Sequence, residues 1–235
     1  MKKLILYIMA MSVILFGNED NDVVLNNATK YVNGKYVKKN YKKAEKILVP
    51  LCKKKVRGSC YLLGRLYFNG AYGLEKNITK HNQYRKLSCN NGSGFACYNM
   101  AKDFFEKNED KKAIVYLQES CDNNFTKGCQ SLGLIYGGKG VEKDYNKSMY
   151  FYKKACILND ALSCYSQATF YLKGFGVEKN SSKTLNFFSK ACKLKDAESC
   201  YSLASMYYHG KYTEKDHTKA IELYKRAYEL AVPRK

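Results

Sequence analysis

Hydrophobic residues along the chain recur with the spacing of an amphipathic helix, and one such stretch returns several times at nearly constant intervals. Cys60, Leu63, Gly64 and Tyr67 fall at positions i, i+3, i+4 and i+7, which lie on one face of a helix. The same face recurs as Cys129, Leu132, Gly133 and Tyr136 and as Cys200, Leu203, Ala204 and Tyr207. The cysteines set a period of 32 to 37 residues, which is typical of helical repeat proteins.

Each repeat is predicted to contain two helices joined by a short turn. The first helix has an aromatic residue five positions before its cysteine in four repeats: Tyr84, Tyr116, Phe151 and Phe187. The second helix has a small residue that lets another backbone approach closely: Gly64, Ala101, Gly133, Ala168 and Ala204. Loop glycines are predicted to end the second helices in a left-handed conformation: Gly70, Gly138, Gly174 and Gly210. The shorter stretch between Cys97 and Cys121 lacks such a glycine, so we expect a tighter turn there.

This pattern predicts an all-α fold of successive αα-hairpins over residues 23–231. The half-repeats at 23–33 and about 217–231 are expected to serve as end caps, which repeat arrays require. Residues 18–22 form a short N-terminal segment in this interpretation, and residues 232–235 form a C-terminal tail.

The ten cysteines form five pairs, each with seven residues between its members. In a helical hairpin with a short turn, residues i and i+8 face each other at the Cα separation that a disulfide needs. Each pair is therefore predicted to close its own hairpin: Cys52–Cys60, Cys89–Cys97, Cys121–Cys129, Cys156–Cys164 and Cys192–Cys200. The competing interpretation is zinc, but zinc sites use closer cysteines, and the histidines at positions 81, 209 and 217 share no motif. No metal and no cofactor is predicted.

The first 17 residues have the pattern of a secretory signal peptide. Lys2 and Lys3 precede a stretch, Leu4 to Phe16, in which only Ser12 is polar. This stretch is shorter than the roughly 20 apolar residues of a membrane-spanning helix. The alternative is an uncleaved membrane anchor. We expect a secreted or periplasmic protein without a transmembrane segment after signal removal, and disulfides persist in those compartments.

The repeated residues resemble a known family. The pattern A-x-x-x-Y-x-x-A-C … C-Y-x-L-x-x-x-Y-x-x-G-x-G-V-E-K-D is similar to the Sel-one-like repeat, a relative of the tetratricopeptide repeat. With C-x7-C in every unit, the chain resembles the Helicobacter cysteine-rich protein family over about residues 23–231. The resemblance implies a right-handed αα superhelix with one disulfide per repeat. It also implies a link to penicillin binding, because family members are often described as β-lactamases.

The residues themselves do not indicate hydrolysis. Serine β-lactamases use S-x-x-K, and no serine in this chain has a lysine three positions later. S-D-N and K-T-G are absent as well, and three scattered histidines do not form a metallo-enzyme site. With all cysteines paired, no thiolate nucleophile remains. No catalytic residue is therefore predicted.

The net charge of +20 favours acidic partners, such as cell-envelope or host-surface ligands or acidic protein segments. A solvated, lysine-rich surface without a specific role is the alternative. Nucleic acid is not expected, because no nucleic-acid motif is present. Four residues, one position beyond the buried aromatic position, are expected to be partly exposed ligand contacts, although helical spacing also suits a core role: Arg85, Tyr152, Phe188 and Tyr224.

The extended bacterial N-glycosylation sequon, Asp/Glu-x-Asn-x-Ser/Thr, occurs at Asn77, Asn124, Asn146 and Asn180. Asn124 is expected in a hairpin turn and the other three in loops between repeats, although the repeated loop sequence also generates such matches by itself.

Two hypotheses follow for function. The favoured one is a monomeric, disulfide-rich repeat scaffold that binds a protein or cell-envelope ligand. The alternative, implied by the resemblance, is a protein that binds β-lactams or peptidoglycan fragments and has weak β-lactamase activity.

Overall fold

The computed structural model describes residues 21–138 and 142–232. The predicted signal peptide, residues 1–17, lies outside these ranges, as do most of the segment 18–22 and of the tail 232–235. Every regular element in the described ranges is a helix. None of these helices is both long and apolar enough to cross a membrane.

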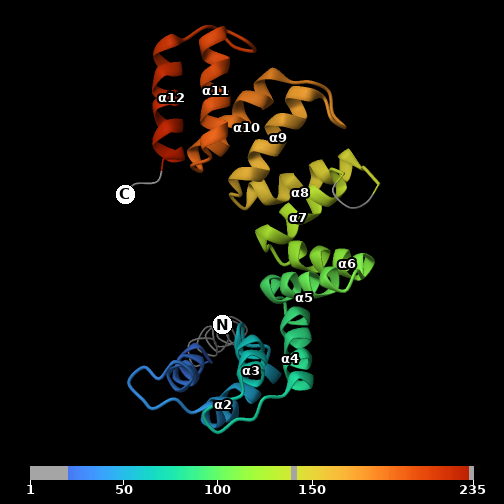
Figure 1. The fold of residues 1–235 in the computed structure, drawn as a ribbon, viewed down its shortest axis with the longest axis vertical. Coiled ribbons are helices and arrows are strands. Elements are labelled where there is room, and N and C mark those ends of the chain that lie inside the picture. Colours follow the sequence, from blue (N-terminus) through green and yellow to red (C-terminus); the bar gives the residue numbers. More distant parts are fainter. Residues whose placement is uncertain (1–20, 139–141, 233–235) are drawn as a thin grey trace, which may run out of the picture. The chain divides into compact units, whose positions relative to one another are not determined.

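The chain forms two compact units, Met1–Phe104 and Phe105–Lys235. The first contains a helix over residues 21–33, followed by α2 (Tyr41–Lys53), α3 (Ser59–Asn69), α4 (Ile78–Asn90) and most of α5 (Gly94–Glu106). The second contains α6 (Asp110–Asp122), α7 (Thr126–Tyr136), α8 (Tyr145–Ile157), α9 (Ala161–Lys173), α10 (Ser181–Lys193), α11 (Ala197–His209) and α12 (His217–Ala231). From α6 to α12, each helix packs against the next one along the chain (Figure 1).

Polar side chains cap the first helix of most repeats, and the exception is α6, whose N-cap residue makes no side-chain cap hydrogen bond. Asn40, Asn77, Asp144, Asn180 and Asp216 are N-caps, and each side-chain oxygen accepts a hydrogen bond from the backbone N–H three residues later. The Asn or Asp that follows a lysine at the end of these loops is therefore a helix start signal. Such caps contribute about 1 kcal/mol each.

The loop glycines end three of the second helices as predicted. Gly70, Gly174 and Gly210 are left-handed C-caps. At the fourth position Gly138 has a positive φ, but the C-cap of α7 is the preceding residue, Gly137. Between α5 and α6 the turn is short, and Asn108 takes the left-handed conformation there.

Five disulfides each join the end of one helix to the start of the next, with Cα–Cα distances of 4.6 to 4.8 Å: Cys52–Cys60, Cys89–Cys97, Cys121–Cys129, Cys156–Cys164 and Cys192–Cys200. All ten cysteines are buried. In every hairpin the third residue after the first cysteine has a positive φ: Lys55, Gly92, Asn124, Asn159 and Lys195. This backbone reversal lets two helices turn within seven residues and brings the sulfur atoms together.

Aromatic rings pack the hairpins onto each other within each unit. Tyr67 stacks on Tyr84 with a centroid distance of 5.7 Å, and the equivalent pairs in the second unit are Tyr136–Phe151 and Tyr171–Phe187. The small residues of the second helices are buried beside these stacks. The core is therefore a series of similar contacts between neighbouring helices, as expected for a repeat protein.

Candidate functional site

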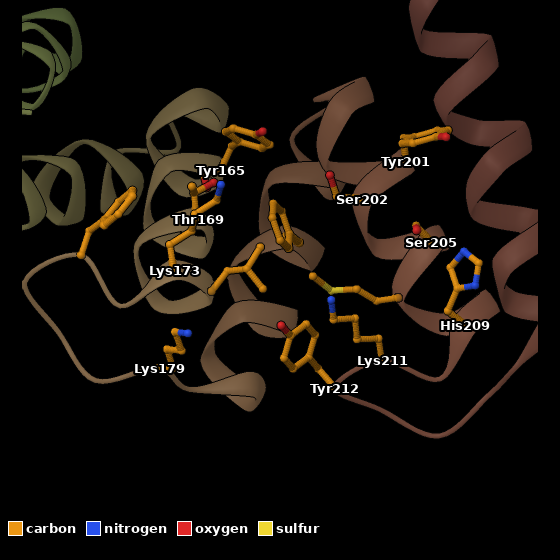
Figure 2. A pocket seen from close by; sticks show the side chains of 14 residues that line it. Tyr165, Thr169, Lys173, Lys179, Tyr201, Ser202, Ser205, His209, Lys211 and Tyr212 are labelled. Atoms are coloured by element: carbon orange, nitrogen blue, oxygen red, sulfur yellow. The ribbon is translucent and has the colours of Figure 1, made fainter.

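A groove of about 860 Å³ lies in the second unit, between α9, α10, α11 and the loops that follow α9 and α11 (Figure 2). Its lining residues are Tyr165, Thr169, Leu172, Lys173, Phe175, Lys179, Phe188, Tyr201, Ser202, Ser205, Met206, His209, Lys211 and Tyr212. The volume is in the range of ligand-binding pockets, and side chains from three helices line the groove.

The repeat geometry positions these side chains. Helices α9 and α11 are the second helices of consecutive repeats, and their lining residues occupy matching positions 36 residues apart, such as Tyr165 with Tyr201 and Thr169 with Ser205. The first helix of the later repeat, α10, lies between them and contributes Phe188. Buried Ala168 and Ala204 allow this close packing.

The floor of the groove is apolar. Phe188 is only 2% exposed and belongs to one buried cluster with Ala168, Leu203 and Met206. Its ring lies 5.5 Å from that of Tyr165. Because the floor is already packed, an apolar side chain entering the groove would contact a preformed apolar surface.

The rim of the groove is cationic. Lys173, Lys179 and Lys211 are exposed, and the fourteen described lining residues include no carboxylate. Glu198 lies close by, but its carboxylate accepts a hydrogen bond of 2.8 Å from the Tyr165 hydroxyl. Burial, followed by this hydrogen bond, raises the pKa of Tyr165 to about 12, so its hydroxyl stays protonated at neutral pH. The groove therefore favours a ligand that combines an apolar group with negative charge.

The groove also presents hydroxyl groups and one imidazole. Ser205 and His209 lie one turn apart on α11, and His209 contacts the ring of Tyr208 edge-on. A serine–histidine catalytic pair needs a third group that orients the imidazole, and the described lining residues offer no carboxylate for that role. These side chains supply hydrogen-bonding groups to a ligand.

The four ligand residues predicted from the sequence do not form one site. Phe188 lies in the groove floor, whereas Tyr224 lines a smaller apolar depression between α11 and α12. Tyr152 and Arg85 line neither of these surfaces. Arg85 forms an ion pair with Asp103 on α5.

The partial exposure expected of Tyr152 and Phe188 is wrong, because they are 5% and 2% exposed. Both side chains point at the small residue of the preceding second helix and are then covered by the following one. Tyr152 fits against Gly133 and contacts the ring of Phe170. Tyr224, on α12, is half-buried.

The four sequon asparagines are all exposed. Asn124 lies in a hairpin turn, and Asn77 and Asn180 are N-caps at the ends of loops. Asn146 was expected in a loop, but it lies in the first turn of α8, because Asp144 is the N-cap of that helix. Glycosylation of these residues remains a proposal, which the intact mass of the native protein would test.

Sequence reasoning did not identify the groove. Its rim and walls come from Phe175, Lys179, Lys211 and Tyr212 in loops and from variable helix positions. The available signal was that Tyr165 and Tyr201 each directly follow the second cysteine of their hairpin and stand three positions before the small residue, Ala168 or Ala204.

The profile of the Sel1 repeat matches residues 31–48, 58–80, 94–125, 127–160, 161–196 and 197–232. Cytochrome c oxidase assembly factor 7 of Xenopus tropicalis is 33% identical over 161 residues, which cover 63% of this chain and 69% of that protein. These matches confirm the prediction of Sel-one-like repeats.

Solved structures agree with this fold. A protective antigen of uropathogenic Escherichia coli superposes with a TM-score of 0.70 at 24% identity, and the match covers 89% of this chain and 46% of the antigen. A Sel1 repeat protein from Oxalobacter formigenes gives 0.63 at 24% identity, covering 86% of this chain and 82% of that one. Helicobacter pylori cysteine rich protein B is 32% identical over 52% of this chain and 88% of its own, with a TM-score of 0.43. The Sel1 repeat matches and the Oxalobacter structure confirm the all-α repeat fold, and five of its hairpins each carry one disulfide.

Proposed function

The chain belongs to the Sel1 repeat family, and from this premise we propose that it is a scaffold that holds a segment of a partner protein in the groove between α9, α10 and α11. Sel1 repeats imply interaction with proteins, and repeat folds use extended surfaces of stacked helices for this purpose. The observation that carries the proposal is the packed apolar floor beneath a cationic rim.

The chemistry of the groove specifies the partner segment. Phe188 and Met206 fit an aromatic or aliphatic anchor side chain, and aromatic walls are typical of binding hot spots. Lys173, Lys179 and Lys211 favour Asp or Glu beside that anchor, because opposite charges at the rim raise the rate of association and select against basic segments. The proposed ligand is therefore an acidic segment with one apolar anchor.

The name of one relative agrees with a binding role. The Xenopus protein is called an assembly factor for cytochrome c oxidase. An assembly factor acts on other proteins, and this agrees with a binding scaffold. We expect the loops and rim of the groove to determine which partner the present chain binds, because loop sequences differ from repeat to repeat.

We also propose that the protein is exported. Five disulfides are typical of proteins outside the reducing cytosol. The apolar stretch from Leu4 to Phe16 supports a cleaved signal peptide. N-terminal sequencing and the intact mass of protein from the native host test this directly. A mature chain that retains residues 1–17, or free thiols in that mass, would contradict export.

The groove is tested with a phage-displayed library of 12-residue peptides selected on the oxidised full-length protein. We expect the selected peptides to combine Asp or Glu with Phe, Tyr or Leu. Tyr212→Asn removes a 41% exposed groove wall, and binding of the selected peptides should weaken about tenfold. Fluorescence anisotropy with labelled peptides gives the Kd values.

The matched control is Tyr36→Asn. Tyr36 occupies the same position in the first loop, is 84% exposed, and shares both the positive φ and the lysine over its ring. Asparagine tolerates the left-handed conformation at both sites. Equal losses in the two variants, or selection of basic peptides, would overturn the assignment of the groove.

The β-lactam alternative is tested in the same preparation with a chromogenic cephalosporin. Turnover that scales with protein concentration and is lost in Tyr212→Asn would favour an enzyme over a scaffold.

A further inference from the structure

The loop between the first helix (21–33) and α2 differs in charge from the other loops between repeats. Residues 35–44 read KYVKKNYKKA, whereas the aligned residues 211–220 before α12 read KYTEKDHTKA. Lys38 occupies the position of a glutamate in the other loops: Glu75, Glu142, Glu178 and Glu214. Lys42 occupies the position of a small polar residue: Thr79, Asn146, Ser182 and Thr218. This loop is therefore more basic than the repeat requires.

The structure gathers these lysines around a shallow cavity of about 810 Å³. Its lining residues are Tyr31, Val37, Lys38, Lys39, Asn40, Lys42, Lys43, Tyr72 and Gly73. All four lysines are exposed. The Lys39 ammonium lies 5.4 Å from the ring centroid of Tyr72, and the Lys43 ammonium lies 5.7 Å from that of Tyr31. The rings hold these two ammonium groups in place at the edge of the cavity.

The positive charge in the cavity is only partly compensated. Glu45 pairs with Lys42 at 3.2 Å, but it is not among the lining residues and also accepts a hydrogen bond from Tyr67. The described lining residues include no carboxylate. Four ammonium groups around one cavity repel one another, and a ligand with several negative charges would relieve that repulsion.

We propose that this cavity binds an anionic polysaccharide that carries sulfate or phosphate groups. Lysine ammonium groups pair with such anions as point charges, without the bidentate geometry that arginine requires. The exposed ring of Tyr72 offers an electron-rich face on which a sugar ring packs. Val37 is the single aliphatic residue among the described lining residues, so the site lacks the apolar floor that anchors a peptide in the groove of the second unit.

The loss-of-function test restores the loop to the pattern of the other repeats. Lys38→Glu with Lys42→Thr introduces residues that the other loops already carry, so the variant keeps the fold. Dextran sulfate is the probe, with unsulfated dextran as the neutral control, and binding is measured by isothermal titration calorimetry at several salt concentrations. We expect the affinity for dextran sulfate to fall about tenfold or more, and its salt dependence to become weaker.

A charge-matched control separates the site from net charge. Lys225→Glu with Arg226→Thr on α12 lowers the net charge by the same three units, at exposed positions of the second unit. We expect this control to bind dextran sulfate nearly as tightly as the unmodified protein. Equal weakening in both double variants would overturn the proposal, because binding would then reflect net charge alone.

A gain-of-function test builds the site at a second place. Glu214→Lys with Thr218→Lys gives the loop before α12 the lysine pattern of residues 35–44, and we expect this change to restore dextran sulfate binding in the Lys38→Glu, Lys42→Thr background. Polyphosphate and poly-glutamate serve as further probes. Poly-glutamate that binds the loop as tightly as dextran sulfate would overturn the assignment to a polysaccharide, and so would tight binding that is confined to anionic lipid vesicles.

Discussion

The two compact units are built from the same disulfide-closed hairpin, yet they present different surfaces. The first unit gathers four lysines around a cavity that lacks an apolar floor, whereas the second has aromatic walls above a packed floor centred on Phe188. The cysteines, the small residues and the N-caps occur in both units at matching positions. The comparison teaches that the repeat fixes the scaffold, and that the residues which the repeat leaves free determine the surface that each unit presents.

The largest expected effect tests whether the scaffold is equivalent in both units. Replacing Cys52 and Cys60 by serine in the first unit, or Cys156 and Cys164 in the second, should each lower the free energy of unfolding by about 2.5 kcal/mol, because each bridge closes a loop of the same length. Urea unfolding of the two double variants measures the loss. A loss in one unit that is several times that in the other would show that the two hairpins depend on their bridges differently.

A second change, glycine to alanine at one repeat position, should affect the two units differently. Gly133 and Gly64 occupy the same repeat position, but a Cβ atom at Gly133 would lie 2.7 Å from the Tyr152 ring, whereas the nearest atom at Gly64 is 3.4 Å away. Gly133→Ala should therefore lower the free energy of unfolding by about 1–3 kcal/mol. Thermal and urea unfolding measure this loss.

Gly64→Ala is the control for that change. It should leave the free energy of unfolding unchanged or raise it by up to about 1 kcal/mol, because alanine fits this position in three other repeats and has the higher helix propensity. A neutral Gly133→Ala would mean that the Tyr152 ring moves aside at no cost.

The smallest effect distinguishes two repeats of the second unit. Lys154 on α8 pairs with Asp122 on α6, whereas Lys190, at the matching position on α10, donates a hydrogen bond to the neutral carbonyl of Cys156. The hydrogen bond from Lys154, and then that from Gln118, lowers the pKa of Asp122. A carboxylate with a lowered pKa stabilises the fold above its unfolded-state pKa of about 4 and loses this contribution as the pH falls through its folded-state pKa.

Lys154→Met should therefore cost less than about 1 kcal/mol at pH 7, because the Asp122 side chain is 52% exposed. This cost should disappear in acid below the folded-state pKa of Asp122. Urea unfolding between pH 2.5 and 7, a range that spans roughly the titration of a carboxylate, measures it. Lys190→Met serves as the control, since its effect should not change with pH over this range. A pH-independent cost for Lys154→Met would assign the effect to the aliphatic stem of the lysine.

The fold could be predicted from the sequence because its determinants are local and repeated. Three features of the sequence determine the hairpins. The spacing of the cysteines allows a disulfide across each turn, the small residues allow close helix packing, and the Asn or Asp at the end of most loops caps the next helix. The exposure of Tyr152 and Phe188 could not be predicted, because it depends on a helix from the following repeat that covers them. Tyr152 faces Gly133 and is buried, whereas Arg85 faces the equivalent Gly64 and is only half-buried, so the size of the facing residue alone does not decide burial.

The groove could not be predicted from the sequence either. Its floor comes from Phe188 on α10 and Met206 on α11, its walls come from α9 and α11, and its rim lysines come from the end of α9 and from two loops. No single stretch of the chain carries this pattern. The lysines of residues 35–44 can be seen in the sequence. The cavity, and the positions of Tyr31 and Tyr72 beside these lysines, can be seen only in the structure.

The eight-residue separation of every bridged pair has a consequence for how the protein matures. Closing a loop of about ten residues takes on the order of 10–100 ns, so each thiol encounters its correct partner far more often than any thiol of another repeat. Oxidation can then proceed hairpin by hairpin, and mispaired species that need an isomerase should be scarce.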